Sequence, residues 1–237
     1  MTALLAFDTA TERLHIGLSI GDKVWVHESE GGPQASSTLL PEIRRLLSEA
    51  AIDLAELDAI AFGRGPGAFT GLRTACSVAQ GLALGVSKPV LAIDTLMAVA
   101  DDAYRRAGTR DVWVAMDARM DEVYAARFCW EPVGWQVAQA PALYTPGGLE
   151  TCWRTQPPTT IAGSAAAAFG ARLDTAGARL VNGARPRARS LLACAQAAWN
   201  LGQATDAALA LPLYLRDRVA LTSVEREARA SAVPARA

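Results

Sequence analysis

The sequence has 237 residues, 51% of them hydrophobic, and a formal net charge of −1 at pH 7. This length and composition predict an ordinary globular protein with one large domain or two smaller lobes. The charge balance argues against broad electrostatic binding of nucleic acid, which depends on clustered Lys and Arg, and no apolar run approaches the length that spans a membrane. Four scattered cysteines without a CxxC pair favour reduced thiols, so we expect a cytoplasmic protein.

The first fifty residues predict a small sheet followed by an amphipathic helix. Strand-like segments at residues 3–8, 13–20 and 23–28 come first, and the Gly-Asp dipeptide between the last two fits a two-residue hairpin turn. Residues 37–51 then repeat apolar side chains at three- and four-residue steps, with charged residues on the other side, which predicts a helix. The apolar positions of this helix are Leu39, Leu40, Ile43, Leu46, Leu47 and Ala50.

A glycine-dense segment at residues 63–73, with the sequence GRGPGAFTGLR, connects an apolar strand-like run at 57–62 to an alanine-rich helical stretch. Its glycines allow a sharp turn or a close approach of the backbone, and Thr70 is expected to cap the following helix. The amides at such a helix start suit a phosphate or a carboxylate. Tight strand-to-helix connections need glycine even without a ligand, and the segment matches neither a Walker A loop nor a GxGxxG motif. We therefore favour a structural turn over phosphate binding.

The residues that follow predict an α/β protein. A strand at 89–94 and a helix at 96–106 add parallel crossovers to the antiparallel start. Past residue 219 the apolar period is lost, and we expect a flexible tail. Between these two regions the pattern predicts a turn at 131–135, a helix at 146–154, a strand at 159–163 and a helix at 189–201.

Comparison of the sequence with itself suggests a duplication. Residues 5–17 can be laid over residues 114–126, and both segments have the pattern of a strand, an Asp, a short turn and a second strand. Two positions of this overlay are identical, so chance similarity stays open. The shared pattern predicts two lobes that begin with the same hairpin, at residues 1–108 and 109–219, followed by a tail at residues 220–237.

Four motifs distributed over the chain resemble one family. They are Phe7-Asp8-Thr9-Ala10-Thr11, Leu39-Leu40-Pro41, the GPGAFTGLR stretch of residues 65–73, and Pro212-Leu213-Tyr214-Leu215-Arg216. The four motifs and their order resemble those of the TsaB (YeaZ) family. These bacterial proteins are needed for the threonylcarbamoyl modification of the adenosine next to the tRNA anticodon. The resemblance implies the two-lobed actin and sugar-kinase fold (ASKHA, ribonuclease H-like). In this α/β architecture each lobe is a mixed sheet flanked by helices, grown from a duplicated βββαβαβα unit.

The resemblance implies a non-catalytic scaffold subunit. Such a family member dimerises with and activates the catalytic subunit TsaD, supports binding of the ATPase TsaE, pairs with itself when alone, and meets tRNA at most through the complex. It has no catalytic residue and no metal site. The residues agree, since a TsaD-like metal site uses two histidines four residues apart on a helix and residues 36–50 contain none. The two histidines of the chain, His15 and His27, fall on opposite faces of the predicted hairpin.

Two other function classes stay open as alternatives. An ATP-dependent small-molecule kinase of the same superfamily would phosphorylate a substrate without a partner, but the second lobe is small for a substrate pocket and an adenosine clamp. A zinc-peptidase-like protein would need metal ligands that two histidines do not supply.

A nucleotide site is a further implication of the resemblance. In nucleotide-using members of the superfamily, a carboxylate at the end of the first strand of each lobe handles the metal and the phosphates, and the residues here are Asp8 and Asp117. The role that we favour for each Asp is to bond backbone amides in its own turn. No cofactor is required, and ATP or ADP is the candidate nucleotide, shared at the complex with TsaD and TsaE. The remaining residues of the candidate phosphate loop are Thr9, Thr11, Gly65, Gly67, Thr70 and Gly71.

The two helices of the first lobe are the predicted partner surface, because their family equivalents form a helix bundle with TsaD. The first helix is amphipathic, and the second is rich in small residues that allow close approach of backbones. The alternative is that both apolar stripes face only the sheet of their own lobe. The predicted contact residues are Leu39, Leu40, Ile43, Leu46, Leu47, Leu72, Ala75, Ala79, Leu82 and Ala83.

Overall fold

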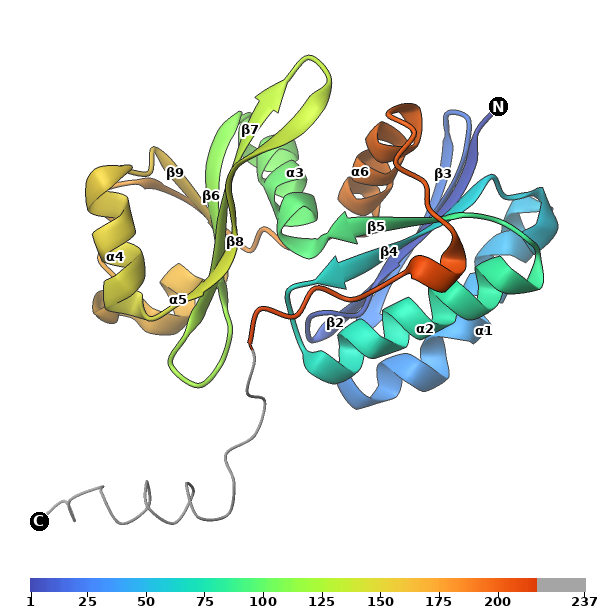
Figure 1. Cartoon of the computed structure of the whole chain (residues 1–237), viewed down its shortest axis with the longest axis horizontal. Coiled ribbons are helices and arrows are strands. Elements are labelled where there is room, and N and C mark those ends of the chain that lie inside the picture. The colour runs from blue at the N-terminus through green and yellow to red at the C-terminus, as the bar shows by residue number, and fades with distance from the viewer. Residues whose placement is uncertain (217–237) are drawn as a thin grey trace, which may run out of the picture.

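The computed structural model describes residues 1–216 and contains two lobes, each built on a five-stranded mixed sheet (Figure 1). This arrangement confirms the predicted α/β fold class with two lobes. The tail predicted at residues 220–237 lies outside the described residues. Among the residues that are described, none of the helices combines the length and the apolar character needed to cross a membrane.

The first sheet has the strand order β3-β2-β1-β4-β5. β1 is antiparallel to β2 and parallel to β4, and every residue of β1 is buried because helices cover both faces of the sheet. The turn between β2 and β3 has two residues, as predicted, because Ile20 pairs with Lys23. The strands are β1 (Ala3–Asp8), β2 (Arg13–Ile20), β3 (Lys23–Glu30), β4 (Ala59–Gly65) and β5 (Val90–Asp94).

The second sheet repeats this connectivity in the order β10-β9-β6-β7-β8. β6 takes the central place of β1, with antiparallel β7 on one side and parallel β9 on the other. Asp8 ends β1 and Asp117 ends β6, so the overlay of the two hairpins agrees with the topology. Sequence patterns missed β8, because its burial does not alternate along the strand. The strands are β6 (Asp111–Asp117), β7 (Val123–Glu131), β8 (Gly134–Tyr144), β9 (Thr160–Gly163) and β10 (Arg179–Asn182).

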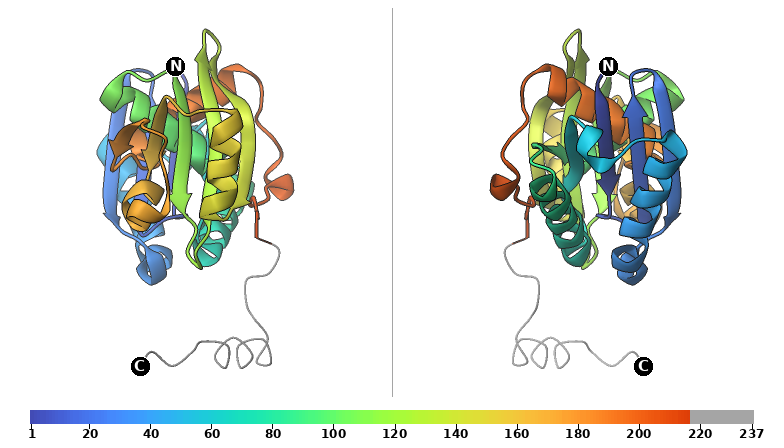
Figure 2. Two further views of the ribbon diagram at one scale, coloured as in Figure 1. Left: turned by 90° about the vertical axis from the view of Figure 1, so that its left-hand side faces the viewer. Right: turned by 90° about the vertical axis from the view of Figure 1, so that its right-hand side faces the viewer.

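Helices form three layers: one on the outer face of each sheet and one between the two sheets (Figure 1, Figure 2). α1 and α2 cover the outer face of the first sheet, α4 and α5 cover the outer face of the second, and α3 and α6 lie between the sheets. The central apolar cluster includes side chains of both sheets, so it joins the lobes. The helices are α1 (Ala35–Ala50), α2 (Phe69–Gly85), α3 (Thr95–Ala107), α4 (Pro146–Thr155), α5 (Ala165–Phe169) and α6 (Ala188–Asn200).

The two central helices pack across the lobes. α3 follows β5 of the first sheet but packs mainly on β6, and α6 follows β10 of the second sheet but packs mainly on β1 and β2. Gly17 of β2 makes room for α6, because a Cβ there would lie 2.7 Å from Leu192 Cδ1. The predicted boundary after residue 108 falls between α3 and β6. A division of the chain into two lobes at this residue stays a prediction, since each central helix is shared between the repeats.

Two helix starts differ from the prediction. α1 begins at Ala35 rather than at residue 37 and follows a short 3-10 turn. α2 begins at Phe69 with Ala68 as its N-cap residue, so Thr70 lies inside the first turn and does not cap the helix. The other predicted helices and strands of the described chain lie within two or three residues of the observed bounds.

The start of α2 lies against the turn that follows β1. Thr9 donates its hydroxyl hydrogen to the carbonyl oxygen of Gly71 at 2.6 Å, and the amide of Ala68 donates to the carbonyl oxygen of Ala10 at 2.8 Å. A Cβ on Gly71 would lie 1.9 Å from the carbonyl oxygen of Thr9. Only glycine permits this approach, so packing alone accounts for the glycine at this position.

Two alanine substitutions in α2 test this packing. Gly71→Ala forces α2 away from the turn after β1, and we expect it to lower the free energy of unfolding by about 1–3 kcal/mol. Gly81→Ala is the matched control in the same helix, because Gly81 is exposed and no heavy atom lies within 4 Å of an added Cβ. The control should be neutral or stabilising by about 0.5–1 kcal/mol. Urea denaturation followed by circular dichroism measures both, and equal effects would contradict the packing argument.

Candidate functional site

A cleft of about 530 Å³ lies between the lobes. The turn after β1, the start of α2, the turn between β6 and β7, and residues 213–216 contribute to its lining. Of the predicted phosphate-site residues, Thr11, Gly67 and Asp117 line the cleft, so the structure brings these three together. The remaining predicted residues, which lie outside its lining, are Asp8, Thr9, Gly65, Thr70 and Gly71.

Asp8 is fully buried behind the first-lobe wall of the cleft. Its Oδ1 accepts a hydrogen bond from the Ala10 amide and its Oδ2 accepts one from the Thr95 hydroxyl, both at 2.7 Å. Burial raises the pKa of Asp8 to about 6, although both hydrogen bonds favour the charged form. A Cβ on Gly63 would lie 1.8 Å from Oδ2, so the carboxyl group is enclosed on that side as well. Asp8 therefore holds the turn together and does not face a ligand.

The glycine-rich loop packs on the same turn. A Cβ on Gly67 would lie 2.5 Å from the carbonyl oxygen of Ala10. Gly65 has a φ of +109° and precedes a cis peptide bond to Pro66. Thr70 is exposed on α2. The glycines serve backbone packing, and none of these contacts requires a phosphate.

Asp117 forms part of the second-lobe wall, and its side chain is 19% exposed. Its Oδ1 accepts a hydrogen bond from the Arg119 amide at 2.8 Å, and its Oδ2 pairs with the Arg119 guanidinium at 3.2 Å. Asp8 makes the same bond to the amide two residues ahead, at Ala10. The two carboxylates at the strand ends thus stabilise equivalent turns in the two lobes.

Asp8 does not offer a carboxylate oxygen to a metal–nucleotide in the cleft, and the oxygens of Asp117 are engaged by its neighbour Arg119. A divalent cation needs carboxylate oxygens that are open to it, whereas Asp8 is enclosed and Asp117 is bonded to Arg119. Within residues 1–216, no group of three or more His, Cys, Asp or Glu side chains could hold a metal ion. His15 and His27 lie on opposite faces of their hairpin, as predicted, because His27 pairs with the neighbour of His15, Ile16.

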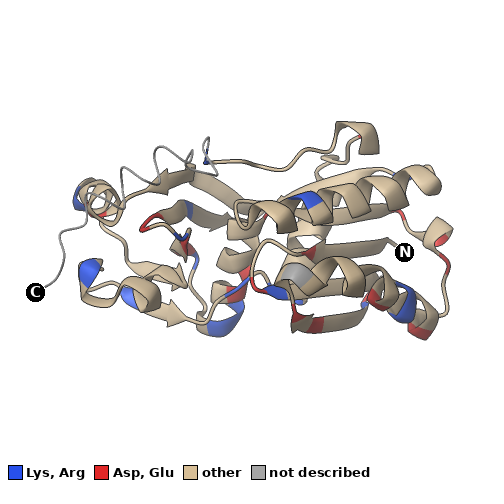
Figure 3. Ribbon diagram, turned by 90° about the horizontal axis from the view of Figure 1, so that it is seen from below, with Lys and Arg blue, Asp and Glu red and all other residues tan. Residues whose placement is uncertain are grey.

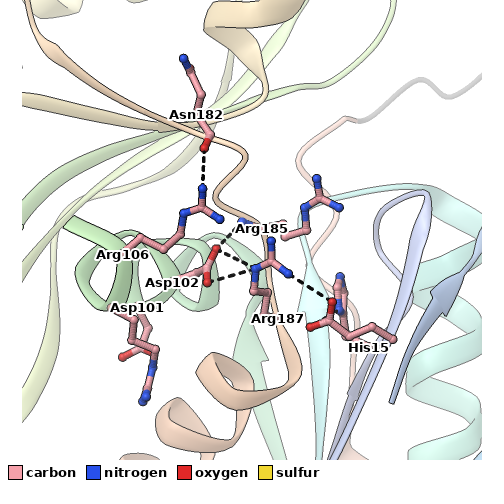
Figure 4. A network of polar contacts seen from close by, with 9 residues as sticks. His15, Asp101, Asp102, Arg106, Asn182, Arg185 and Arg187 are labelled. Atoms are coloured by element: carbon pink, nitrogen blue, oxygen red, sulfur yellow. Dashed lines mark hydrogen bonds and ion pairs between the residues drawn. The ribbon is translucent and has the colours of Figure 1, made fainter. Parts of the chain in front are cut away.

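A network of charged side chains also joins the lobes (Figure 4). Arg187, just before α6, pairs with Glu28 of β3 at 3.2 Å and with Asp102 of α3 at 3.3 Å. The Nδ1 atom of His15 lies 3.5 Å from the Glu28 carboxylate. Burial lowers the pKa of His15 to about 4, so this side chain is a neutral core residue at pH 7. Arg187 connects the first sheet to a helix that packs on the second.

The predicted partner surface needs a correction in its residues. Of the ten predicted contact residues, Leu40 is 42% exposed and Leu82 is half-buried. The other eight are buried, and seven of them belong to the apolar core under α1 and α2. Ile43 and Leu47 also line a groove between α1 and α2, so these two are not wholly closed to a partner. Ala79, one of the predicted contact residues, is an inward position with no exposed surface. The eight buried residues are Leu39, Ile43, Leu46, Leu47, Leu72, Ala75, Ala79 and Ala83.

Within the described residues 1–216, the sides of α1 and α2 that carry Leu40, Gly81 and Leu84 are exposed, whereas residues 207–216 pack along another side of α2. A groove of about 690 Å³ lies between the C-terminal half of α1, the residues that follow it and α2. Leu40, Ile52, Leu54 and Leu82 contribute its apolar lining. α2 contains one charged residue, Arg73, and the ribbon of Figure 3 shows the rest of the helix without charged positions. The sequence signal for this surface is the lack of charge in α2, rather than the apolar stripe that faces the sheet.

Comparison with known proteins identifies the family. The family model described as "TsaD: tRNA N6-adenosine threonylcarbamoyltransferase" matches residues 26–223. The tRNA threonylcarbamoyladenosine biosynthesis protein TsaB of Escherichia coli (strain K12) is 38% identical over 144 residues, which are 60% of this chain and 62% of that protein. TsaB of Haemophilus influenzae is 40% identical over 131 residues, which are 55% of this chain and 55% of that protein. The chain thus spans less than two thirds of these curated relatives.

Solved structures extend the match over most of the chain. YeaZ from Pseudomonas aeruginosa is similar with a TM-score of 0.83 and 39% sequence identity, covering 91% of this chain and 100% of that one. A structure described as an uncharacterized protein with similarity to peptidase YEAZ, also from Pseudomonas aeruginosa, gives a TM-score of 0.84 at 38% identity with the same coverage. The chain belongs to the TsaB (YeaZ) branch of the TsaD family.

Proposed function

We propose that this chain is a non-catalytic subunit required for the formation of N6-threonylcarbamoyladenosine in tRNA. One observation carries the proposal: the strand-end carboxylates near the cleft are bonded within the chain, while the outward face of α2 is open and almost uncharged. The related TsaB proteins are named for this biosynthesis. A TsaD-like catalytic subunit is the partner that this face would bind and activate. TsaE would join the pair, and tRNA would be met through the complex.

The surface of α1 and α2 supports partner binding on physical grounds. Leu40 and Leu84 are 42% and 58% exposed, and Leu82 lines the groove between the helices. Gly81 and Gly85 have open space around them, which allows a partner helix to approach closely. A specific interface covers roughly 800 Å² on each partner. Burial of a leucine contributes about 1.5–3 kcal/mol, from which the loss of association entropy is subtracted. The same face would pair two copies of the chain when the partner is absent.

Leu40→Arg tests this surface. We expect it to weaken binding to the TsaD of the same organism by about 30-fold or more, because a charge in the groove would be desolvated in the interface. Val133→Arg is the matched control, since Val133 is 58% exposed at the turn between β7 and β8, away from α1 and α2. Titration calorimetry with purified TsaD measures both affinities, and circular dichroism checks folding. Wild-type affinity in Leu40→Arg would place the interface elsewhere.

We also infer that the isolated chain does not bind ATP or ADP in its cleft, and that a nucleotide needs ligands from the complex with TsaD and TsaE. The enclosed Asp8 and the Arg119-bonded Asp117 support this inference. Titration calorimetry of the chain alone with MgATP and MgADP should detect no binding at micromolar affinity. Micromolar binding that is lost in Asp117→Ala would contradict the inference and place the nucleotide in the cleft.

The same contacts favour a catalytically silent chain over the two enzymatic alternatives. A small-molecule kinase has to hold a metal–nucleotide between the lobes, and a zinc peptidase needs metal ligands that the described residues do not bring together. Assays of the purified chain for ATP hydrolysis and peptide cleavage should give no turnover. Turnover by the chain alone would overturn the scaffold role.

Depletion of the chain in its own host tests whether the chain is required for threonylcarbamoyladenosine formation. We expect threonylcarbamoyladenosine in bulk tRNA to fall to a small fraction of its normal level, because TsaD lacks its partner. Mass spectrometry of digested tRNA nucleosides measures the change. Re-expression of Val133→Arg should restore the modification, and re-expression of Leu40→Arg should restore it less. Normal modification after depletion would contradict the proposed function.

A further inference from the structure

The motif Pro212-Leu213-Tyr214-Leu215-Arg216 has no part in the proposed partner surface. It lies in a segment that we name the strap, residues 210–216. The strap runs from the 3-10 turn Ala207–Leu209 past the start of α2 toward the turn between β6 and β7 (Figure 1). Residues 213–216 line the cleft. The strap therefore touches both lobes where they face each other.

The strap is bonded to α2 and β4 of the first lobe. The carbonyl oxygen of Ala210 accepts hydrogen bonds from Gln80 Nε2 at 3.2 Å and from Cys76 Sγ at 3.4 Å. Farther along, the amide of Leu213 donates to the carbonyl oxygen of Arg64 at 2.7 Å. These bonds fix the path of the strap along the first lobe.

Tyr214 adds a side-chain anchor at the start of α2. Its ring centroid lies 5.1 Å from that of Phe69, and its hydroxyl accepts a hydrogen bond from Arg73 Nε at 3.2 Å. The guanidinium carbon of Arg73 lies 3.9 Å from the Phe69 ring centroid. Aromatic and cation–π contacts thus hold this end of the strap on the first lobe.

Arg216 attaches the other end of the strap to the second lobe. Its side chain is 16% exposed, and its Nε and Nη2 donate to Glu122 Oε2 at 3.1 and 2.5 Å. Nη2 also donates to the carbonyl oxygens of Ala118 at 3.1 Å and Arg119 at 3.2 Å. One guanidinium therefore binds a carboxylate and two main-chain carbonyls of the same turn, and such charge-assisted bonds are the stronger kind.

The turn that Arg216 binds has a strained backbone. Arg119, Met120 and Asp121 have φ values of 61°, 56° and 64°, in the left-handed region. This region is unfavourable for residues with a Cβ, and three such residues in succession need support from their surroundings. Arg216 supplies part of that support, because two of its bonds are to carbonyl groups at the beginning of this stretch.

We propose that the strap is an intramolecular tie that couples the first lobe to the β6–β7 turn and holds the cleft at its observed width. Leu213 and Tyr214 anchor one end and Arg216 anchors the other. A single residue, Leu215, separates the anchors, so release of one end loosens the other. The tie acts within the isolated chain and does not depend on the identity of the partner. It gives the C-terminal motif the role of setting the relative position of the lobes.

Arg216→Ala tests the tie by hydrogen–deuterium exchange of the isolated full-length chain. The amides to follow are those of Leu213, which bonds to Arg64 in the first lobe, and of Ala118 and Glu122, which bond within the β6–β7 turn. We expect all three to exchange at least about 10-fold faster, because the loss of several charge-assisted bonds releases both ends of the strap. Amides of β1 and β6 should exchange as in the wild type, which reports an intact fold.

Arg172→Ala is the matched control. Arg172 pairs with Asp121 of the same turn at 2.6 Å, but the two side chains are 62% and 63% exposed and the pair does not involve the strap. The substitution removes an equal positive charge that pairs with the same turn, and exchange at Leu213 should stay at the wild-type rate. Equal acceleration at Leu213 in both variants would overturn the tie. Wild-type exchange at Leu213 in Arg216→Ala would overturn it as well.

Tyr214→Ala is the second variant if Arg216→Ala does not fold. It releases the strap from Phe69 and Arg73 of the first lobe and leaves the Arg216 contacts in place. Faster exchange at Glu122, in the other lobe, supports the tie. Wild-type exchange at Glu122 in a folded Tyr214→Ala overturns it.

Discussion

The close backbone contact between the turn after β1 and the start of α2 determines one wall of the cleft. Thr9 and Ala10 approach Gly67 and Gly71 at distances that no side chain allows, and Asp8 is enclosed beneath them. This close contact fixes the position of the start of α2 relative to the turn after β1. Two of the motifs that carry the family resemblance, FDTAT and GPGAFTGLR, meet at this contact. Their packing against each other explains their composition without a bound phosphate.

The crossing of α3 and α6 makes the lobes dependent on each other. Each helix packs mainly on the sheet of the other repeat, and both sheets contribute side chains to one central apolar cluster. Separation of the lobes would expose this cluster to water, which is unfavourable. The contacts of Arg187 and Arg216 add charged ties between the lobes. A molecule built in this way keeps its outer faces in a fixed arrangement, as the proposed scaffold role requires.

The strand-end carboxylates show why position in the fold does not by itself define a nucleotide site. In both lobes the Asp bonds the amide two residues ahead, and this bond stabilises a turn with or without a metal. Asp8 is also enclosed by Gly63 and bonded to Thr95. The cleft therefore offers few free carboxylate oxygens, and the proposed function rests on the outward face of α2 instead.

Local sequence patterns determined most of the strands and helices, the two-residue turn before Lys23 and the repeated hairpin, because these depend on neighbouring residues, and short motifs indicated the family. The tertiary structure decided which side of each helix is available. An amphipathic stripe looks the same in sequence whether it faces its own sheet or a partner, so the pattern predicts Leu39 and Ala79 at the partner surface although both are buried in the core. It also brought Arg216 to Glu122, 94 residues away, and Arg187 to Glu28, 159 residues away. Such pairs form only when the lobes close on each other, and no local pattern contains that geometry.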